Sequence, residues 1–110
     1  MAVNAPFTPS GNTVTFTAAT TAPAAVQAVS TTLGGNQYRI LNAGSVVAFL
    51  GIGTTAAAAN AAAVAVTSSG LAIPLLAGTD EIITFAPNAY FTAVTASSTA
   101  VIYITPGDGN

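Results

Sequence analysis

The stretch QYRILNAGSVVAFL, residues 37–50, decides the fold class of this chain. Its first half alternates in polarity, with Tyr38 and Ile40 on one face of an extended chain and polar side chains on the other. This two-residue period is typical of a half-buried strand. The sequence Asn42-Ala43-Gly44 is a turn signal, because asparagine and glycine tolerate the backbone angles of tight turns. Residues 45–50, which follow, are almost entirely apolar and predict a strand that is covered on both faces.

The same pattern recurs outward from this stretch in both directions. Residues 13–17 alternate strictly, with Val14 and Phe16 on one face and threonines on the other. Turn signals recur at intervals of roughly 8–12 residues, the spacing expected of a sandwich or barrel. Strands are predicted at residues 13–17, 24–30, 37–41, 45–50, 71–76, 80–85, 90–95 and 99–105. About eight short strands predict an all-β fold, an antiparallel two-sheet sandwich of jelly-roll-like architecture.

Two segments carry additional signals. Pro74 removes a backbone donor from the strand at residues 71–76, which places that strand at a sheet edge or at a bulge. Residues 55–66 are mostly alanine, the best helix former, and Thr55 is available as an N-cap. We therefore expect this alanine-rich connection to contain one or two helical turns.

A chain of 110 residues has room for one domain with one core. We place this sandwich domain at residues 13–110, after an N-terminal arm at residues 1–12. The predicted core consists of Phe16, Ile40, Val47, Phe49, Ile83, Phe85, Val94, Ile102 and Ile104.

The N-terminal arm is uncharged and contains Pro6 and Pro9, which disfavour a regular internal strand. A free arm would normally be polar, yet Val3 and Phe7 are apolar. Two arrangements stay open. In the first, Phe7 folds back onto its own sandwich. In the second, the arm reaches a neighbouring subunit and Phe7 is an anchor in a pocket there.

Charge is scarce along the whole chain. The apolar fraction is 52%, and the charged side chains are Arg39, Asp80, Glu81 and Asp108. Soluble domains are about 25% charged. A folded monomer of this size exposes roughly 5,500 Å², or about 1,400 Å² per charge, whereas a standard interface takes about 800 Å² per partner. Whole interface-sized patches are therefore free of charge, which predicts a subunit covered by neighbours, such as a homo-oligomeric dimer or trimer.

The composition also excludes several functions. One arginine and no lysine cannot neutralise a row of phosphates, so we expect no nucleic-acid partner. No apolar run approaches the ~18 residues of a membrane span, so we expect no membrane partner. Without Cys or His, zinc fingers, iron–sulfur clusters and nucleophile–base relays cannot form. We therefore expect no enzyme activity, no cofactor, and no catalytic, cofactor-binding or metal-binding residue.

One motif resembles a cofactor site in form. GIGTTA at residues 51–56 matches the dinucleotide fingerprint G-x-G-x-x-A. That fingerprint also needs an acidic residue about 20 positions further on, whereas Asp80 lies 29 positions after Gly51. A dinucleotide-binding sheet would also need alternating strands and helices. We therefore interpret these glycines as part of a turn.

The charged side chains in the strands have mainly structural interpretations. Asp80 and Glu81 are adjacent in a predicted strand, so they point to opposite faces and cannot converge on one substrate or metal ion. We expect Asp80 to serve the turn at residues 78–79 and Glu81 to be solvated. For Arg39 two roles stay open. It could pair with an acid on a neighbouring strand, worth about 0–1 kcal/mol if exposed. It could instead anchor an intersubunit contact, where arginine is enriched.

Three stretches together resemble a known class of proteins. They are QYRILNAGS at 37–45 leading to Phe49, LAIP at 71–74 leading to AGT at 77–79, and VIYITPGDG at 101–109. Together they resemble small virion proteins of tailed bacteriophages, among them capsid decoration or cement proteins with β-sandwich folds. The resemblance covers residues 37–109. It implies a structural role on a phage head, with the major capsid protein as partner and no catalytic residue.

We therefore expect a structural virion protein that decorates and stabilises, or cements, a bacteriophage capsid by binding neighbouring shell subunits. The first residues lack the positive and apolar regions of a signal peptide, so we expect synthesis in the host cytoplasm and a final location on the capsid surface. The expected assembly-interface residues are Val3, Pro6, Phe7 and Arg39.

The alternative function is a carbohydrate- or receptor-binding module of a phage fibre or adhesin. Such modules usually place aromatic platforms in loops. This chain has no Trp, and Tyr38, Tyr90 and Tyr103 all fall within predicted strands.

Overall fold

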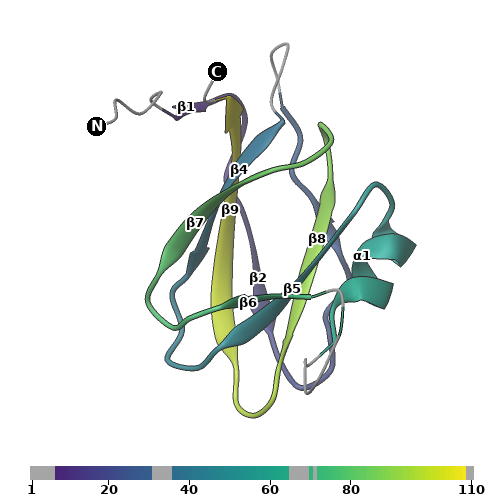
Figure 1. The fold of residues 1–110 in the computed structure, drawn as a ribbon, viewed down its shortest axis with the longest axis vertical. Helices are drawn as coiled ribbons and strands as arrows, with labels where there is room; N and C mark the ends of the chain where they lie inside the picture. The colour runs from purple at the N-terminus through teal and green to yellow at the C-terminus, as the bar shows by residue number, and fades with distance from the viewer. Residues whose placement is uncertain (1–6, 31–35, 65–69, 71, 109–110) are drawn as a thin grey trace.

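The computed structural model describes residues 7–30, 36–64, 70 and 72–108. In these residues the chain forms nine β-strands and one short α-helix, and the strands make two antiparallel sheets that pack face to face (Figure 1). Eight strands overlap the eight predicted ones, so the predicted two-sheet sandwich is confirmed. The elements are β1 (Thr8–Pro9), β2 (Val14–Ala18), β3 (Val26–Gln27), β4 (Gln37–Asn42), β5 (Ala48–Gly53), α1 (Ala56–Ala62), β6 (Ile73–Leu75), β7 (Asp80–Thr84), β8 (Tyr90–Thr95) and β9 (Ala100–Asp108).

The strand order is that of a jelly roll. β2 pairs with β9, β3 with β8, β4 with β7 and β5 with β6, so the chain folds like one long antiparallel hairpin. Rolling up this hairpin joins β4 to β9 and β5 to β8. One sheet then has the order β2-β9-β4-β7, with β1 added beside the C-terminal end of β9, and the other has the order β3-β8-β5-β6. Two sheets related in this way are the architecture of jelly-roll proteins.

The core lies between the sheets and is built from the inward-facing side chains of both. Its largest fully buried apolar members are Tyr38, Ile40, Leu50, Leu75, Phe91, Ile102 and Ile104. Alanines from several strands fill the space between them. The predicted core residues Phe16, Ile40, Ile102 and Ile104 are buried, and Ile83 and Phe85 are partly buried against this cluster.

The core prediction is wrong for the face of β5. Val47 and Phe49 are only half-buried, and the strand instead turns Ala48 and Leu50 into the core. Val94 lies opposite Phe49 in the register, so it is also on the outer side of its sheet, where it is buried. The reason is that the stretch is apolar on both faces. Alternation therefore gave no signal for which face points inward.

The helix α1 covers the outer side of β5, and two glycines permit its close approach. A Cβ atom at Gly51 would lie 2.3 Å from the Ala59 carbonyl oxygen, and one at Gly53 would lie 2.6 Å from the Ala59 nitrogen. Thr55 is the N-cap, as predicted, and its hydroxyl accepts a hydrogen bond from the Ala58 N–H at 3.1 Å. The interpretation of the GIGTTA glycines as part of a turn is therefore wrong, because Gly51 and Gly53 lie within β5 and serve helix-on-sheet packing.

The turn after β4 carries the chain from one sheet to the other. The predicted turn at residues 42–44 does separate two strands, but β4 and β5 belong to different sheets and do not pair with each other. Asn42 is fully buried, and its amide donates to the carbonyls of Val46 and Leu75 at 3.0 Å each, while its side-chain oxygen accepts from the Gly44 N–H at 2.9 Å. One asparagine therefore fixes the crossing and ties it to β6.

Tyr38 links the two sheets at the opposite end of β4. Its ring contacts Phe91 of the other sheet edge-on, with centroids 4.8 Å apart. Its hydroxyl donates to the Ala86 carbonyl and accepts from the Ala89 N–H at 3.1 Å. Burial raises the pKa of Tyr38 above its usual value, and hydrogen bonds with the backbone at Ala89 and Asn88 oppose part of that rise. The phenol is therefore held in its neutral, hydrogen-bonding form.

Candidate assembly surface

The outward face of the sheet β2-β9-β4-β7 is the surface best suited to a partner. Its side chains are brought together in cross-strand rows by the pairing register, in which Tyr103 faces Leu41 and Arg39 faces Ile82. Three of these side chains are large, apolar and exposed: Leu41 at 36%, Tyr103 at 40% and Ile82 at 53%. We call this surface the outer face; it consists of Thr13, Thr15, Thr17, Arg39, Leu41, Asp80, Ile82, Tyr103 and Thr105.

Threonines line one side of the outer face, as the alternation at residues 13–17 predicts. The Thr15 hydroxyl donates to the Ile102 carbonyl at 2.9 Å, and the hydroxyls of Thr13 and Thr105 are 2.7 Å apart. These bonds satisfy the hydroxyls within the sheet. The hydroxyls of Thr13, Thr15 and Thr105 therefore already have partners before any other molecule binds.

Arg39 of β4 and Asp80 of the edge strand β7 form an ion pair on the outer face. The Arg39 Nη2 and Nε atoms both approach the Asp80 Oδ2 atom, at 2.8 and 2.9 Å. More than half of the arginine side chain is exposed, so the pair contributes at most about 1 kcal/mol to stability. The predicted pairing of Arg39 with an acid on a neighbouring strand is confirmed. The predicted role of Asp80 in the adjacent turn is not, since the hydroxyl of Thr79 makes the turn's bond to the Leu76 carbonyl.

A shallow hollow of about 250 Å³ lies beside this ion pair. Its lining residues are Thr13, Arg39, Leu41, Tyr103 and Thr105. An aromatic ring, a guanidinium group and an aliphatic side chain therefore surround one concave spot on an otherwise flat sheet. Tyrosine and arginine are enriched among the residues that dominate binding at interfaces.

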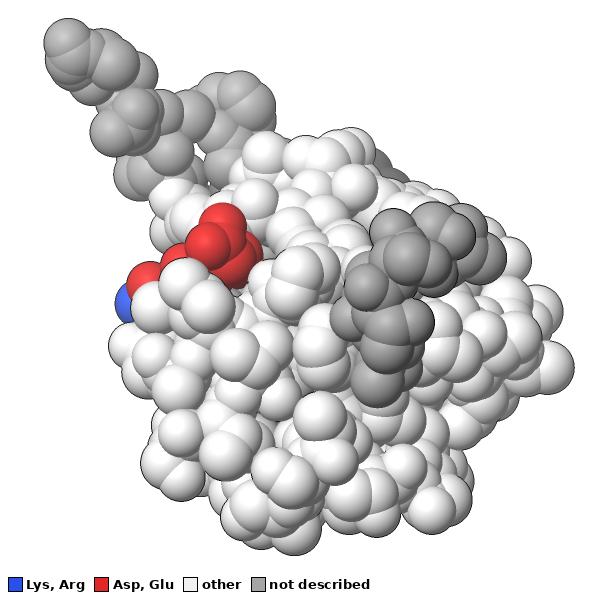
Figure 2. All heavy atoms as spheres, turned by 60° about the horizontal axis from the view of Figure 1, so that its bottom comes forward, with Lys and Arg blue, Asp and Glu red and all other residues white. Residues whose placement is uncertain are grey.

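Charge is sparse on the face of the molecule that Figure 2 shows. Figure 2 shows the acidic and basic atoms gathered at one edge of the visible face, while the rest of the described surface in that view carries none. The total exposed area is 5607 Å², close to the value expected from chain length. Neutral areas of interface size therefore exist on the folded molecule.

The sheet edges differ in how they are protected. Pro74 lies in β6, which is an edge strand as predicted. On the other sheet the edge strand is β7, where Glu81 lies opposite Ile40 and so is on the inward side, yet remains exposed as predicted. A proline and an inward-pointing charge are both devices that discourage unwanted strand pairing. These edges therefore favour partners that bind through side chains.

The predicted interface residues fall in different places. Val3 and Pro6 lie outside the described residues, and Phe7 is half-buried just before β1. Arg39 is on the outer face. Ile82 and Tyr103 were not among the predicted interface residues; the pairing of β4 with β7 and β9 places both on the face of Arg39.

Comparison with protein-family models, with curated proteins and with solved structures gives no match for this chain. Among the described residues, no helix has the length and apolar character of a membrane span, and no three acidic, His or Cys side chains gather as a metal site.

Proposed function

We propose that this chain is a structural virion protein that decorates and cements a bacteriophage capsid by binding neighbouring shell subunits through its outer face. The observation that carries the proposal is the exposure of Leu41, Ile82 and Tyr103 around a single ion pair on a charge-poor sheet. A surface of this kind gains free energy when it is covered, because exposed apolar area leaves water.

The jelly-roll fold supports the same proposal. This architecture is common among viral capsid and lectin domains, although fold alone does not establish function. A cementing role needs rigid shape, neutral apolar surface and no catalysis. Repetition over many copies makes a modest affinity for each contact sufficient to stabilise a shell.

Co-sedimentation with shell particles tests the proposal. Purified chain is mixed with shells assembled from the cognate major capsid protein alone and then pelleted. The decisive variant is Ile82→Asp, which adds a charge to an exposed position of the outer face. Losing this apolar contact and burying a carboxylate should weaken binding roughly tenfold or more.

The matched control places the same charge elsewhere. Ala57→Asp lies on the exposed side of α1, in the first helical turn, where an acidic residue is favourable. It should bind shells like the unmodified chain. Failure of the unmodified chain to bind shells, or equal binding by Ile82→Asp, would contradict the proposal.

The hollow beside Tyr103 favours a second candidate, the carbohydrate- or receptor-binding module. An aromatic ring next to hydrogen-bonding side chains suits the mixed apolar and polar surface of a sugar. Binding to a glycan array that is lost in Tyr103→Ala, together with no affinity for shells, would support this second function over the first.

A further inference from the structure

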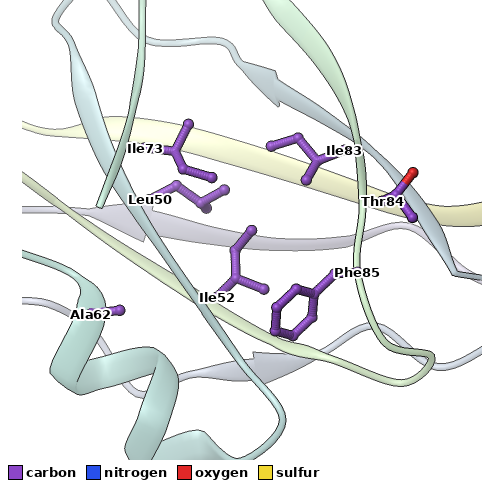
Figure 3. Close-up of a pocket in the computed structure, with 7 residues that line it drawn as sticks. All are labelled: Leu50, Ile52, Ala62, Ile73, Ile83, Thr84 and Phe85. Carbon is purple, nitrogen blue, oxygen red and sulfur yellow. The ribbon is translucent and has the colours of Figure 1, made fainter. Parts of the chain in front are cut away.

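An apolar pocket opens between the two sheets at the edge formed by β6 and β7. Its volume is about 340 Å³, and its lining residues are Leu50, Ile52, Ala62, Ile73, Ile83, Thr84 and Phe85. Figure 3 shows the side chains of Ile73 and Ile83 directed toward each other, with Ile52 and Phe85 close by. Since Leu50 is fully buried and Ile73 is 36% exposed, the pocket runs from the core to the surface.

The two edges of the sandwich differ in this respect. At the opposite edge β2 and β3 contact each other, and Val14 and Val26 pack against the core. The pocket therefore marks an incomplete closure of the core at the β6–β7 edge. An apolar cavity of roughly 150 Å³ already accommodates a benzene ring, so this one has room for a phenylalanine side chain and a smaller neighbour. None of its lining residues in the described part of the chain is charged.

The N-terminal segment has the matching chemistry. Residues 2–7, AVNAPF, carry no charge. In an extended chain Val3, Ala5 and Phe7 share one face, because alternate residues point the same way. Ala5 and Thr8 each precede a proline, which disfavours the helical conformation at both positions. In a fully extended form six residues would span roughly 20 Å.

The register shows where this segment leaves the sheet. Thr8 pairs with Asp108 and Pro9 with Gly107, so residues 2–7 join the sheet at the C-terminal end of β9, and a straight continuation of β1 would point away from the sheet. Pro9 pairs with Gly107, Gly107 with Gln37, and Gln37 with Thr84 beside the pocket. Thr84 therefore lies three strand spacings, or roughly 14 Å, from Pro9 across the sheet. To enter its own pocket, an extended segment would have to reverse and cross the sheet. A neighbouring molecule imposes no such reversal.

We propose that residues 2–7 insert into the pocket between the sheets of a second copy of this chain, with Val3, Ala5 and Phe7 against Ile73, Ile83 and Phe85. The inserted segment completes the open side of the neighbour's core. Reciprocal insertion gives a closed twofold dimer, and one-way insertion gives a ring where the rotation between copies closes. This self-association does not depend on the binding of shells, which uses the outer face.

Disulfide trapping tests the contact directly, because the chain has no native cysteine. A Val3→Cys chain is mixed with an Ile73→Cys chain and oxidised gently, and the products are separated on a non-reducing gel. A covalent heterodimer is expected. The control mixture replaces Ile73→Cys by Thr17→Cys, an exposed position on the opposite side of the sandwich. Heterodimer no more abundant than in the control would overturn the proposal.

The double variant Val3→Cys/Ile73→Cys separates insertion into a neighbour from insertion into the same molecule. Insertion into a neighbour gives covalent dimers or rings. A product that runs only as a cross-linked monomer would overturn the proposal and place the segment in its own pocket.

Filling the pocket gives an independent test in the full-length chain. Ala62→Leu adds apolar volume to the pocket lining, and Ala61→Leu adds the same group on the exposed side of α1. Sedimentation equilibrium should show self-association weakened roughly tenfold or more by Ala62→Leu, as for the loss of an anchor side chain, and unchanged by Ala61→Leu. Thermal melting by circular dichroism confirms that both variants fold. Equal association of both variants, or a small apolar molecule retained in the pocket by native mass spectrometry, would contradict the proposal.

Deletion of residues 2–7 distinguishes the two proposals from each other. The deletion leaves Thr8 and Pro9 in place, so β1 is kept. We expect loss of self-association while single molecules still bind shells. A truncated chain that self-associates like the full-length chain would overturn the insertion proposal but not the proposed function. The proposed function stands if the truncated chain binds shells and the Ile82→Asp chain does not.

Discussion

Gly51→Ala should disturb the packing of α1 on the sheet. The added Cβ would lie 2.3 Å from the Ala59 carbonyl oxygen and 2.6 Å from the Ala63 nitrogen. Both are backbone atoms, so no side-chain rotation relieves the contact. Either the helix stays in place under strain or it moves outward and loses its packing.

Both outcomes have a similar magnitude. Overpacking of this kind costs about 1–3 kcal/mol. Moving the helix exposes the buried methyl groups of Ala59, Ala62 and Ala63, at about 0.8 kcal/mol each. Alanine is better than glycine within a strand by about 0.5–1 kcal/mol, which offsets part of the loss. We expect a net loss of about 1–2 kcal/mol in the free energy of unfolding.

Urea denaturation followed by circular dichroism measures this loss, and hydrogen exchange reports on the helix. The control is Gly78→Ala, where φ is +72° and a Cβ would meet nothing within 4 Å. It should cost about 1 kcal/mol from backbone strain alone, with the amides of α1 still protected. A Gly51→Ala variant that keeps normal stability and full protection of α1 would refute the packing role of this glycine.

Three further changes test the interior. The pKa of Tyr38 is raised in the folded state. The contribution of this phenol to the free energy of unfolding is therefore complete below the ordinary tyrosine pKa of about 10 and is lost as pH rises through the folded value. The free energy of unfolding should fall above about pH 10, and this fall should be smaller in Tyr38→Phe. Asn42→Ala should lose about 2–4 kcal/mol in urea denaturation, because the carbonyls of Val46 and Leu75 are left without a donor; a loss below about 1 kcal/mol would mean that water replaces the amide. Phe49→Ala should lose only about 1–2 kcal/mol, since its ring is half-buried; a loss above about 3 kcal/mol would place it in the core.

The strands were predictable because turn residues and alternation are local signals. Residues 13–17 and 37–41 each carry a two-residue period, and both form strands with the expected face inward. The N-cap at Thr55 and the edge position of Pro74 also follow from local chemistry. These features depend on neighbours in sequence.

The pairing partners of the strands, and the strand faces that point into the core, were harder to predict from the sequence. No local sequence signal shows that the backbone of α1 packs against Gly51, or that the turn at Asn42 connects the two sheets. The exposed pair Ile82 and Tyr103 lies on separate strands that are brought together only by the long-range pairing of β4 with β7 and β9. The alternation of residues 37–41 predicts which face of its own strand Arg39 occupies. The neighbours of Arg39 on that face are determined by strand pairing, which the sequence pattern does not show.

Quantitative mass spectrometry of purified virions tests the central proposal most directly. The measurement is the number of copies of this chain relative to the major capsid protein in particles of the cognate phage. A decoration protein predicts a fixed ratio close to a simple fraction of the number of shell subunits, lost when Ile82→Asp replaces the unmodified chain. Absence from the particle, or a few copies confined to detached tails or fibres, would contradict it.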